Sequence, residues 1–269
     1  MSRDSASVSL LDLGVKIEMK NVCLCKLASL QEYFSKSRTI TITMTTNWQP
    51  TADDLESIAA AKTAFKQGNT NDDVIKFYSE WVKEGKYQKD TEPERYRAHI
   101  LACENIENYY PGSKDEVKVI DIGAGTGRVA VELLKKGFKV MDALEPTAEM
   151  LDEAKEQNLY KNYMQLGIGA DRLPIDDNTY DLAIVSGAMG EGHIPCEALH
   201  EMARIVRPGG IISISMREEF LDSCTDYRGR LEPLMKKMEE DGEWKLVSRE
   251  IRPNYYCGKS GLVYRYSPC

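Results

Sequence analysis

Three alternating glycines, Gly123, Gly125 and Gly127, follow an apolar run at residues 117–122 that is rich in β-branched side chains. Such a run predicts a buried strand, and a helix-like pattern begins at Arg128. Glycines at a strand-to-helix turn let a ligand lie directly against the backbone, and the helix N-terminus offers unpaired N–H groups. These residues therefore predict a site for a nucleotide-like ligand at the edge of a parallel sheet.

An acidic residue, Glu145, follows the next predicted strand. Its distance from Gly127 is close to the roughly 20 residues at which such folds place the acid that binds a ribose. A carboxylate there can accept hydrogen bonds from both ribose hydroxyls. Asp142 lies inside the same strand, short of the carboxyl end where ligands bind, so we predict Glu145 to be the ribose-binding acid.

The glycine spacing separates two classes of nucleotide site. Dinucleotide enzymes need G-x-G-x-x-G/A, in which a small sixth residue lets the helix pack closely on the strand. Arg128 stands at that sixth position, and the pattern is G-x-G-x-G instead. A nicotinamide-dependent oxidoreductase is therefore a disfavoured alternative.

Strand-like and helix-like segments alternate through the rest of the chain, which favours parallel βαβ units. A long connection containing Pro, Asn and Gly separates the last two predicted strands and allows an antiparallel return. We predict strands at 117–122, 138–144, 163–168, 180–186, 211–216, 244–251 and 262–266, and helices at 128–136, 148–157, 195–206 and 226–241. The expected fold class is α/β, a Rossmann-like, doubly wound, seven-stranded, mostly parallel sheet with an antiparallel last strand and an N-terminal helical lid.

Several motifs, in this order, resemble those of class I S-adenosylmethionine-dependent methyltransferases: Asp121–Gly127, Glu145, Leu173-Pro174 with Tyr180-Asp181, and Arg207–Gly210. More narrowly, residues 74–81 and 188–196 are similar to the methyltransferase family named for the Williams–Beuren deletion region. That likeness spans about residues 72–265. It implies an enzyme that uses S-adenosylmethionine as cofactor, and it implies no substrate, because the family is named by its fold.

The resemblance implies roles for particular residues. Asp121 would orient the glycine turn and reach the cofactor's ammonium, and Glu145 would bind its ribose. Either the Asp171 side chain or the backbone at Ala170 would hold the adenine. The complete set expected to bind the cofactor is Tyr78, Trp81, Asp121, Gly123, Ala124, Gly125, Thr126, Gly127, Glu145, Pro146, Ala170, Asp171, Ser186, Gly187 and Ala188.

Two features admit more than one interpretation. Tyr78 and Trp81 lie at helical spacing, so they can form the apolar face of a helix, or they can close over the sulfonium together with Tyr87 as a lid, or both. Glu191 and His193 follow the fourth strand and are the candidates for a general base. We expect no metal site.

The organisation expected for the chain has three parts: residues 1–70 as a poorly ordered N-terminal extension, 71–112 as a helical lid segment, and 113–269 as the methyltransferase domain. A net charge of −8 argues against nucleic acid as a partner, and scattered cysteines together with the lack of a long apolar run favour a cytoplasmic protein without membrane contact. We expect a monomer with a small-molecule acceptor. A protein acceptor and a non-catalytic S-adenosylmethionine-binding interaction protein are the alternatives.

Overall fold

The computed structural model describes residues 5–10, 15–20 and 49–269, and the chain divides into two compact units, Met1–Gln49 and Pro50–Cys269. In the first unit, β1 (Ser5–Leu10) pairs antiparallel with β2 (Val15–Lys20). The rest of the expected N-terminal extension up to residue 48 lies outside the described residues. Its expected end at residue 70 differs from the structure, because α2 (Ala52–Ala64) is part of the second unit.

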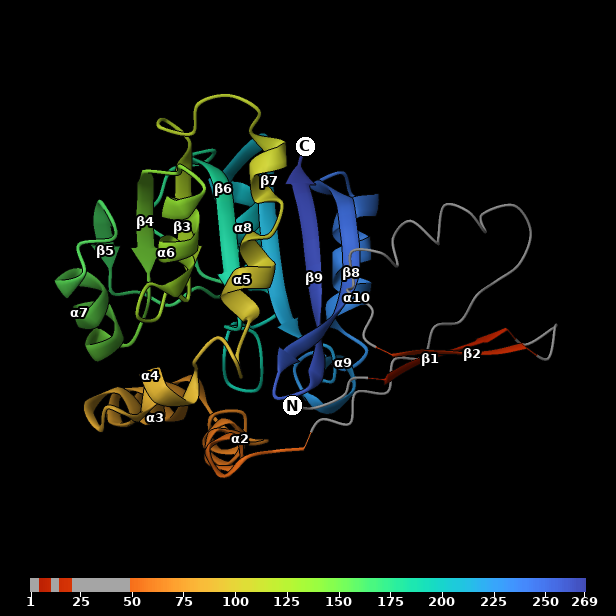
Figure 1. Ribbon diagram of the computed structural model, residues 1–269. Helices are drawn as coiled ribbons and strands as arrows, with labels where there is room; N and C mark the ends of the chain where they lie inside the picture. Colours follow the sequence, from red (N-terminus) through yellow and green to blue (C-terminus); the bar gives the residue numbers. More distant parts are fainter. Residues whose placement is uncertain (1–4, 11–14, 21–48) are drawn as a thin grey trace. The chain divides into compact units, whose positions relative to one another are not determined.

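The second unit is built on a seven-stranded sheet with the order β5-β4-β3-β6-β7-β9-β8 (Figure 1). The first five strands in this order run parallel, and β9 is antiparallel to both of its neighbours. This confirms the predicted fold class. The strands are β3 (Lys118–Ile122), β4 (Val140–Leu144), β5 (Asn162–Met164), β6 (Tyr180–Ser186), β7 (Val206–Arg217), β8 (Trp244–Tyr256) and β9 (Lys259–Pro268).

Helices cover both faces of this sheet and enclose two apolar cores. On one face, α5 (Ala98–Cys103), α6 (Arg128–Lys135) and α7 (Ala148–Glu156) pack on the sheet through residues such as Cys103, Leu133 and Leu151. On the other, α8 (Ala198–Ile205) and α10 (Leu231–Glu240) pack through residues such as Met202 and Met235. Short helices η2 (Ile106–Tyr109) and α9 (Phe220–Ser223) complete the unit.

Three helices, α2, α3 (Asn71–Lys83) and α4 (Lys86–Asp90), lie beyond the carboxyl ends of the parallel strands (Figure 1). Capping boxes define the N-termini of α2 and α3: Thr51 pairs with Asp54, and Thr70 pairs with Asp73. The Trp81 indole N–H donates to Asp90 Oδ2 at 2.9 Å and so ties α3 to α4. We call these three helices the lid.

The chain between the lid and β3 is less helical than its apolar spacing predicts. The apolar spacing over residues 93–108 predicts one helix, but the structure has only α5 and η2 there, because residues 93–97 run along the β8–β9 turn. There the Arg97 N–H donates to the Tyr255 carbonyl at 2.9 Å, and Tyr96 forms an isolated bridge with Tyr256. Within the described residues, we find no helix with the length and apolar character needed to span a membrane.

Candidate active site

The strand register brings the predicted site residues to one edge of the sheet. Ile122 at the end of β3 is level with Leu144 of β4 and with Val185 of β6. The next residues along each strand, Gly123, Glu145 and Ser186, therefore meet at the same edge, which the lid covers. This edge, at the reversal of strand order between β3 and β6, is where open α/β sheets bind ligands.

Glu145 is buried at this edge, with 5% of its surface exposed. Its Oε2 accepts a hydrogen bond from the Gly125 N–H at 2.9 Å, and its Oε1 accepts one from the Thr147 N–H at 2.8 Å. Burial raises the pKa of Glu145, and the two backbone N–H groups oppose that rise. Since a carboxylate has about four lone-pair sites, each oxygen can still accept a hydrogen bond from a ligand.

A cavity opens beside Glu145, with about 720 Å³ of space that includes its open mouth. Its walls are the glycine turn, the residues after β4 and β6, and aromatic side chains of the lid. Residues of the predicted set that line it are Tyr78, Gly123, Gly125, Glu145, Pro146, Ser186, Gly187, Ala188 and His193. We call it the first cavity.

The glycine turn needs glycine for two different physical reasons. Gly123 has a φ of +70°, and a Cβ there would lie 2.4 Å from the Ala188 Cβ, so the loop after β6 packs against bare backbone. Gly125 has a φ of +54°, and a Cβ there would meet only the Tyr87 hydroxyl at 3.6 Å and the Met150 sulfur at 3.8 Å. Gly125 therefore leaves open the space that the first cavity occupies.

Asp121 lies behind the turn and does not line the first cavity. Its Oδ2 accepts a hydrogen bond from the Tyr160 hydroxyl at 2.5 Å, and its Oδ1 has no partner among the described residues. Burial, with the nearby charge of Glu145, raises the pKa of Asp121 to about 7 despite the bond from Tyr160. In the free protein, Asp121 is thus a buried carboxyl group with one unsatisfied oxygen.

This environment predicts that Asp121→Asn stabilises the free protein, and more so at pH 8 than at pH 5. The folded-state pKa near 7 exceeds the ordinary unfolded value near 3.9, so the contribution of Asp121 to stability falls as pH rises between these values. We expect the variant to gain roughly 1–3 kcal/mol at pH 8 in urea unfolding, and much less at pH 5. A difference from wild type that is equal at both pH values would contradict the prediction.

His193 presents a ring nitrogen to the first cavity. Its Nδ1 lies 2.8 Å from the Glu191 carbonyl oxygen and donates to it, which leaves Nε2 to accept from the Tyr78 hydroxyl at 3.1 Å. The ring also stacks on Phe65 of the lid, with centroids 4.3 Å apart. Burial, together with the positive charge of Arg217, lowers the pKa of His193 to about 4 despite the hydrogen bond to the Glu191 carbonyl, which raises it.

We therefore expect His193 to be neutral and protonated at Nδ1 throughout the physiological pH range. Imidazole nitrogen and carbon NMR shifts recorded from pH 5 to pH 8 should show no titration of this ring. Tyr78→Phe should leave the tautomer unchanged, because the Glu191 carbonyl fixes it. A His193 midpoint between pH 6 and pH 7 would contradict this description.

Several predicted residues lie outside the first cavity. Glu191 faces away from it: its carboxylate accepts from the Gly68 N–H at 3.2 Å and the Thr225 N–H at 2.8 Å, and so joins two loops. Asp171 is exposed and lines an open hollow that shares residues 166–168 and His193 with the first cavity. Trp81 lines a neighbouring cavity. The other predicted residues that do not line the first cavity are Ala124, Thr126, Gly127 and Ala170.

Other cavity residues were not in the predicted set. Tyr96 reaches the site from the segment before α5, and Thr147 anchors Glu145 through its N–H. Tyr87, expected only as part of the lid, also lines the cavity. The apolar stretch 166–168 forms the wall on the side where the adenine-binding residues were expected. The strand predicted at 163–168 already included this stretch. Nothing in the local sequence indicates that Tyr96 comes close to the site.

Comparison with known proteins supports this description. Residues 119–210 match a family described as a methyltransferase domain. The chain is 29% identical to human methyltransferase-like protein 27 over 171 residues, which are 64% of this chain and 68% of that protein. It is 28% identical to the ubiquinone/menaquinone biosynthesis C-methyltransferase UbiE of Campylobacter jejuni (serotype O:6, strain 81116 / NCTC 11828), over 47% of this chain and only 57% of that relative.

Among solved structures, a methyltransferase in complex with the Trm112 methyltransferase activator of Haloferax volcanii has the same fold. The TM-score is 0.53 at 16% identity, over 71% of this chain and 97% of that one. The family match and the human relative show an S-adenosylmethionine-dependent methyltransferase, and the solved structure shows the same fold. The resemblance to the Williams–Beuren-region family is confirmed by the similarity to human methyltransferase-like protein 27.

Proposed function

We propose that this enzyme binds S-adenosylmethionine in the first cavity and transfers its methyl group to a small-molecule acceptor. The observation that carries the proposal is the geometry of Glu145. Two backbone N–H groups, from Gly125 and Thr147, fix its carboxylate at the cavity wall and leave lone pairs for two ribose hydroxyls.

The other polar and apolar groups of the first cavity fit the same cofactor. Ser186 Oγ is buried at the cavity wall without a hydrogen-bond partner among the described residues, so it is free to bond to the amino-acid end. Pro146, Met150 and the stretch 166–168 supply apolar surface for an adenine ring. The faces of Tyr78 and Tyr87 suit a sulfonium cation.

The bound cofactor supplies an activated methyl group, so the protein mainly has to orient the acceptor and exclude water. Tyr78, Tyr87 and Tyr96 serve both purposes, because they close the cavity on the lid side. Where the acceptor must lose a proton, we assign the base to His193 Nε2 rather than to Glu191, with the Tyr78 hydroxyl passing its own proton to Nε2 as it takes the proton of the acceptor. Only His193 faces the cavity, and it is kept neutral by burial.

A small acceptor is favoured by what surrounds the site. A second cavity of about 450 Å³ adjoins the first and shares Tyr78, Tyr87, Tyr96 and Gly187 with it. Its walls are the lid and the β8–β9 turn, and this enclosure suits a compact molecule better than a long polymer. The UbiE relative is named for a step in the synthesis of quinones, which are small molecules.

The proposal is tested by incubating the enzyme with S-adenosylmethionine carrying a labelled methyl group and a fractionated cell extract. We expect label in the small-molecule fraction, and none with Glu145→Gln. If the label is found only in protein, the acceptor is a protein and the proposed small-molecule acceptor is wrong. Tight cofactor binding without transfer of the label to any fraction would favour a non-catalytic interaction protein. NADH should not raise the melting temperature, because we do not expect a nicotinamide-dependent enzyme.

A further inference from the structure

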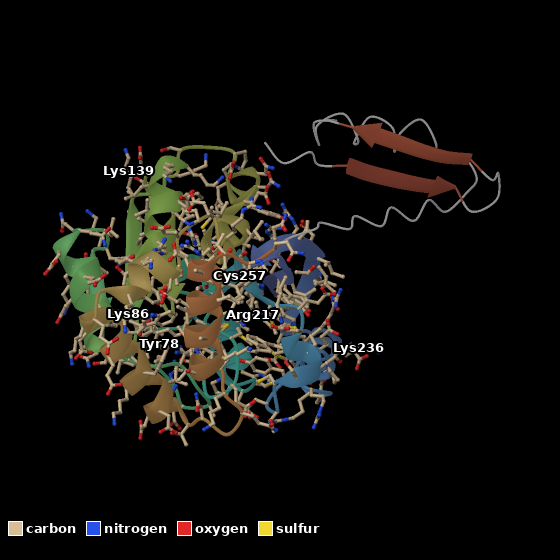
Figure 2. All side chains as sticks on the ribbon, turned by 60° about the horizontal axis from the view of Figure 1, so that its bottom comes forward. Tyr78, Lys86, Lys139, Arg217, Lys236 and Cys257 are labelled. Carbon is tan, nitrogen blue, oxygen red and sulfur yellow. The ribbon has the colours of Figure 1, made fainter. Side chains whose placement is uncertain are left out.

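The second cavity has an unusual wall for a site of its size. Its lining is dominated by aromatic rings, and Arg217 is the only charged residue among the described residues that line it. Figure 2 looks toward this end of the molecule and labels Arg217 and Tyr78, which both line this cavity. The full lining is Ser57, Ala61, Phe65, Tyr78, Trp81, Tyr87, Thr91, Tyr96, Gly187, Met189, Arg217, Phe220, Tyr255 and Tyr256.

Arg217 ends β7 and is largely buried, with 12% of its side chain exposed. Its guanidinium carbon lies 4.1 Å from the ring centre of Tyr256, 4.9 Å from that of Phe65 and 5.3 Å from that of Phe220. Aromatic faces interact with the charge of a guanidinium. They leave its N–H groups, which point outward in the guanidinium plane, without acceptors.

Among the described residues, the Arg217 guanidinium makes no hydrogen bond, and its one ion pair, to Glu219 Oε1, has a distance of 3.7 Å. Other buried arginines of the unit are bonded much more closely. Arg95 reaches Asp54 at 2.9 Å, Arg204 reaches Glu201 at 2.7 Å, and Arg265 reaches Glu250 at 2.8 Å. Since Arg217 lines the second cavity and its N–H groups make no hydrogen bond to the described residues, the difference points to a ligand that pairs with its guanidinium.

We propose that the second cavity binds the methyl acceptor, and that this acceptor is a small aromatic carboxylate whose carboxylate pairs with Arg217. The planar fork of an arginine matches a carboxylate, and the surrounding rings match a flat apolar body. A phosphate would bring a larger charge to a cavity that offers a single cation. This inference rests on the proposed function, since the first cavity must hold the cofactor for the second to hold the acceptor.

The wall shared by the two cavities supports this arrangement. Tyr78 lines both cavities, and its hydroxyl donates to His193 Nε2 at 3.1 Å. A molecule with its carboxylate on Arg217 would extend its opposite end toward Gly187 and this Tyr78–His193 pair. The residue that fixes the acceptor and the residue that can take its proton therefore lie on one path from the second cavity to the first.

The test is binding of benzoate, phenylacetate and indole-3-acetate to the full chain, compared with the corresponding neutral amides, by thermal shift and calorimetry with S-adenosylhomocysteine present. At least one carboxylate should bind wild type clearly more tightly than its amide. In Arg217→Gln the affinity for that carboxylate should fall at least about tenfold, and Arg217→Lys should be intermediate. The matched control is Arg249→Gln, because Arg249 also packs on a ring, that of Tyr264, but does not line the cavity.

Two results would overturn the inference: no carboxylate bound better than its amide, or equal carboxylate affinity in wild type and Arg217→Gln. Binding of S-adenosylhomocysteine to Arg217→Gln shows whether that variant is folded. If Arg217→Gln does not fold, two measurements still test the inference. One compares the affinities of acid and amide for wild type, and the other measures the affinity of the carboxylate for Arg217→Lys. If wild type itself fails to bind S-adenosylhomocysteine, the proposed function fails, whereas the carboxylate series without cofactor still tests Arg217.

Discussion

S-Adenosylhomocysteine should bind Glu145→Gln about a hundredfold more weakly than wild type. The substitution disrupts both the hydrogen bonds that hold this side chain in place and its hydrogen bonds to the ribose. The glutamine amide can accept from only one of the two N–H groups, of Gly125 and Thr147, that the carboxylate now serves. Its NH₂ group would then face the other N–H, donor against donor. The ribose would also lose a charged acceptor, and hydrogen bonds to charged groups are worth roughly 1.5–3 kcal/mol each.

Asp142→Asn is the matched control for this prediction, because it makes the same carboxylate-to-amide change inside β4, the strand that Glu145 follows. Asp142 accepts from Asn162 and from the Tyr180 hydroxyl, and it does not line the first cavity. Its amide variant should keep the affinity of wild type in calorimetry. Equal loss in both variants would mean that Glu145 supports the sheet edge and is not specific to the cofactor.

Gly125→Val should abolish measurable binding of S-adenosylhomocysteine. A Cβ at Gly125 has no severe clash, but the branched side chain would extend toward the Tyr87 hydroxyl and the Met150 sulfur, into the first cavity. The φ of +54° adds strain for a branched residue, at a cost of about 1–3 kcal/mol of folding stability. Calorimetry measures the lost affinity, and urea unfolding measures the strain separately.

Gly137→Val distinguishes those two effects. Gly137 has a φ of +91° after α6, and a Cβ there would meet no atom within 4 Å. This variant should lose folding stability to a similar degree and still bind the cofactor product normally. If Gly125→Val binds as tightly as Gly137→Val, then the glycine turn does not border the cofactor.

The sheet and the glycine turn could be predicted from sequence because their signals are local. A β-branched run, positive-φ glycines and an acid after the next strand each follow from short-range chemistry. Parallel strands then bring their carboxyl ends to one edge, so Glu145 could be placed beside Gly125 without knowledge of the packing. Strand ends were less well predicted, and β5 has only three residues.

A helical lid was expected from the spacing of its apolar residues, but the second cavity could not be predicted in this way, because its residues meet only through the tertiary fold. Arg217 reads in sequence as the polar end of a strand, and Phe65 reads as the end of a weakly amphipathic helix. Their contact joins α2 to β7. For Glu191, in contrast, the sequence suggested a role that the geometry does not support. Its place in a glycine-flanked loop suggested a base, but two backbone N–H groups bind its carboxylate away from the first cavity.

The site also carries an expected trade-off between stability and binding. Asp121 is buried with one oxygen unsatisfied, so it weakens the free protein. Groups of this kind are retained where a ligand completes them. The stabilisation expected for Asp121→Asn would be a direct sign of this cost.

The most direct test of the central claim is calorimetric titration of S-adenosylhomocysteine into the wild-type chain and the four variants Glu145→Gln, Asp142→Asn, Gly125→Val and Gly137→Val. We expect one molecule bound per wild-type chain, wild-type affinity in Asp142→Asn and Gly137→Val, and at least about hundredfold weaker binding in Glu145→Gln and Gly125→Val. A folded wild-type chain that binds neither this product nor S-adenosylmethionine would contradict the account.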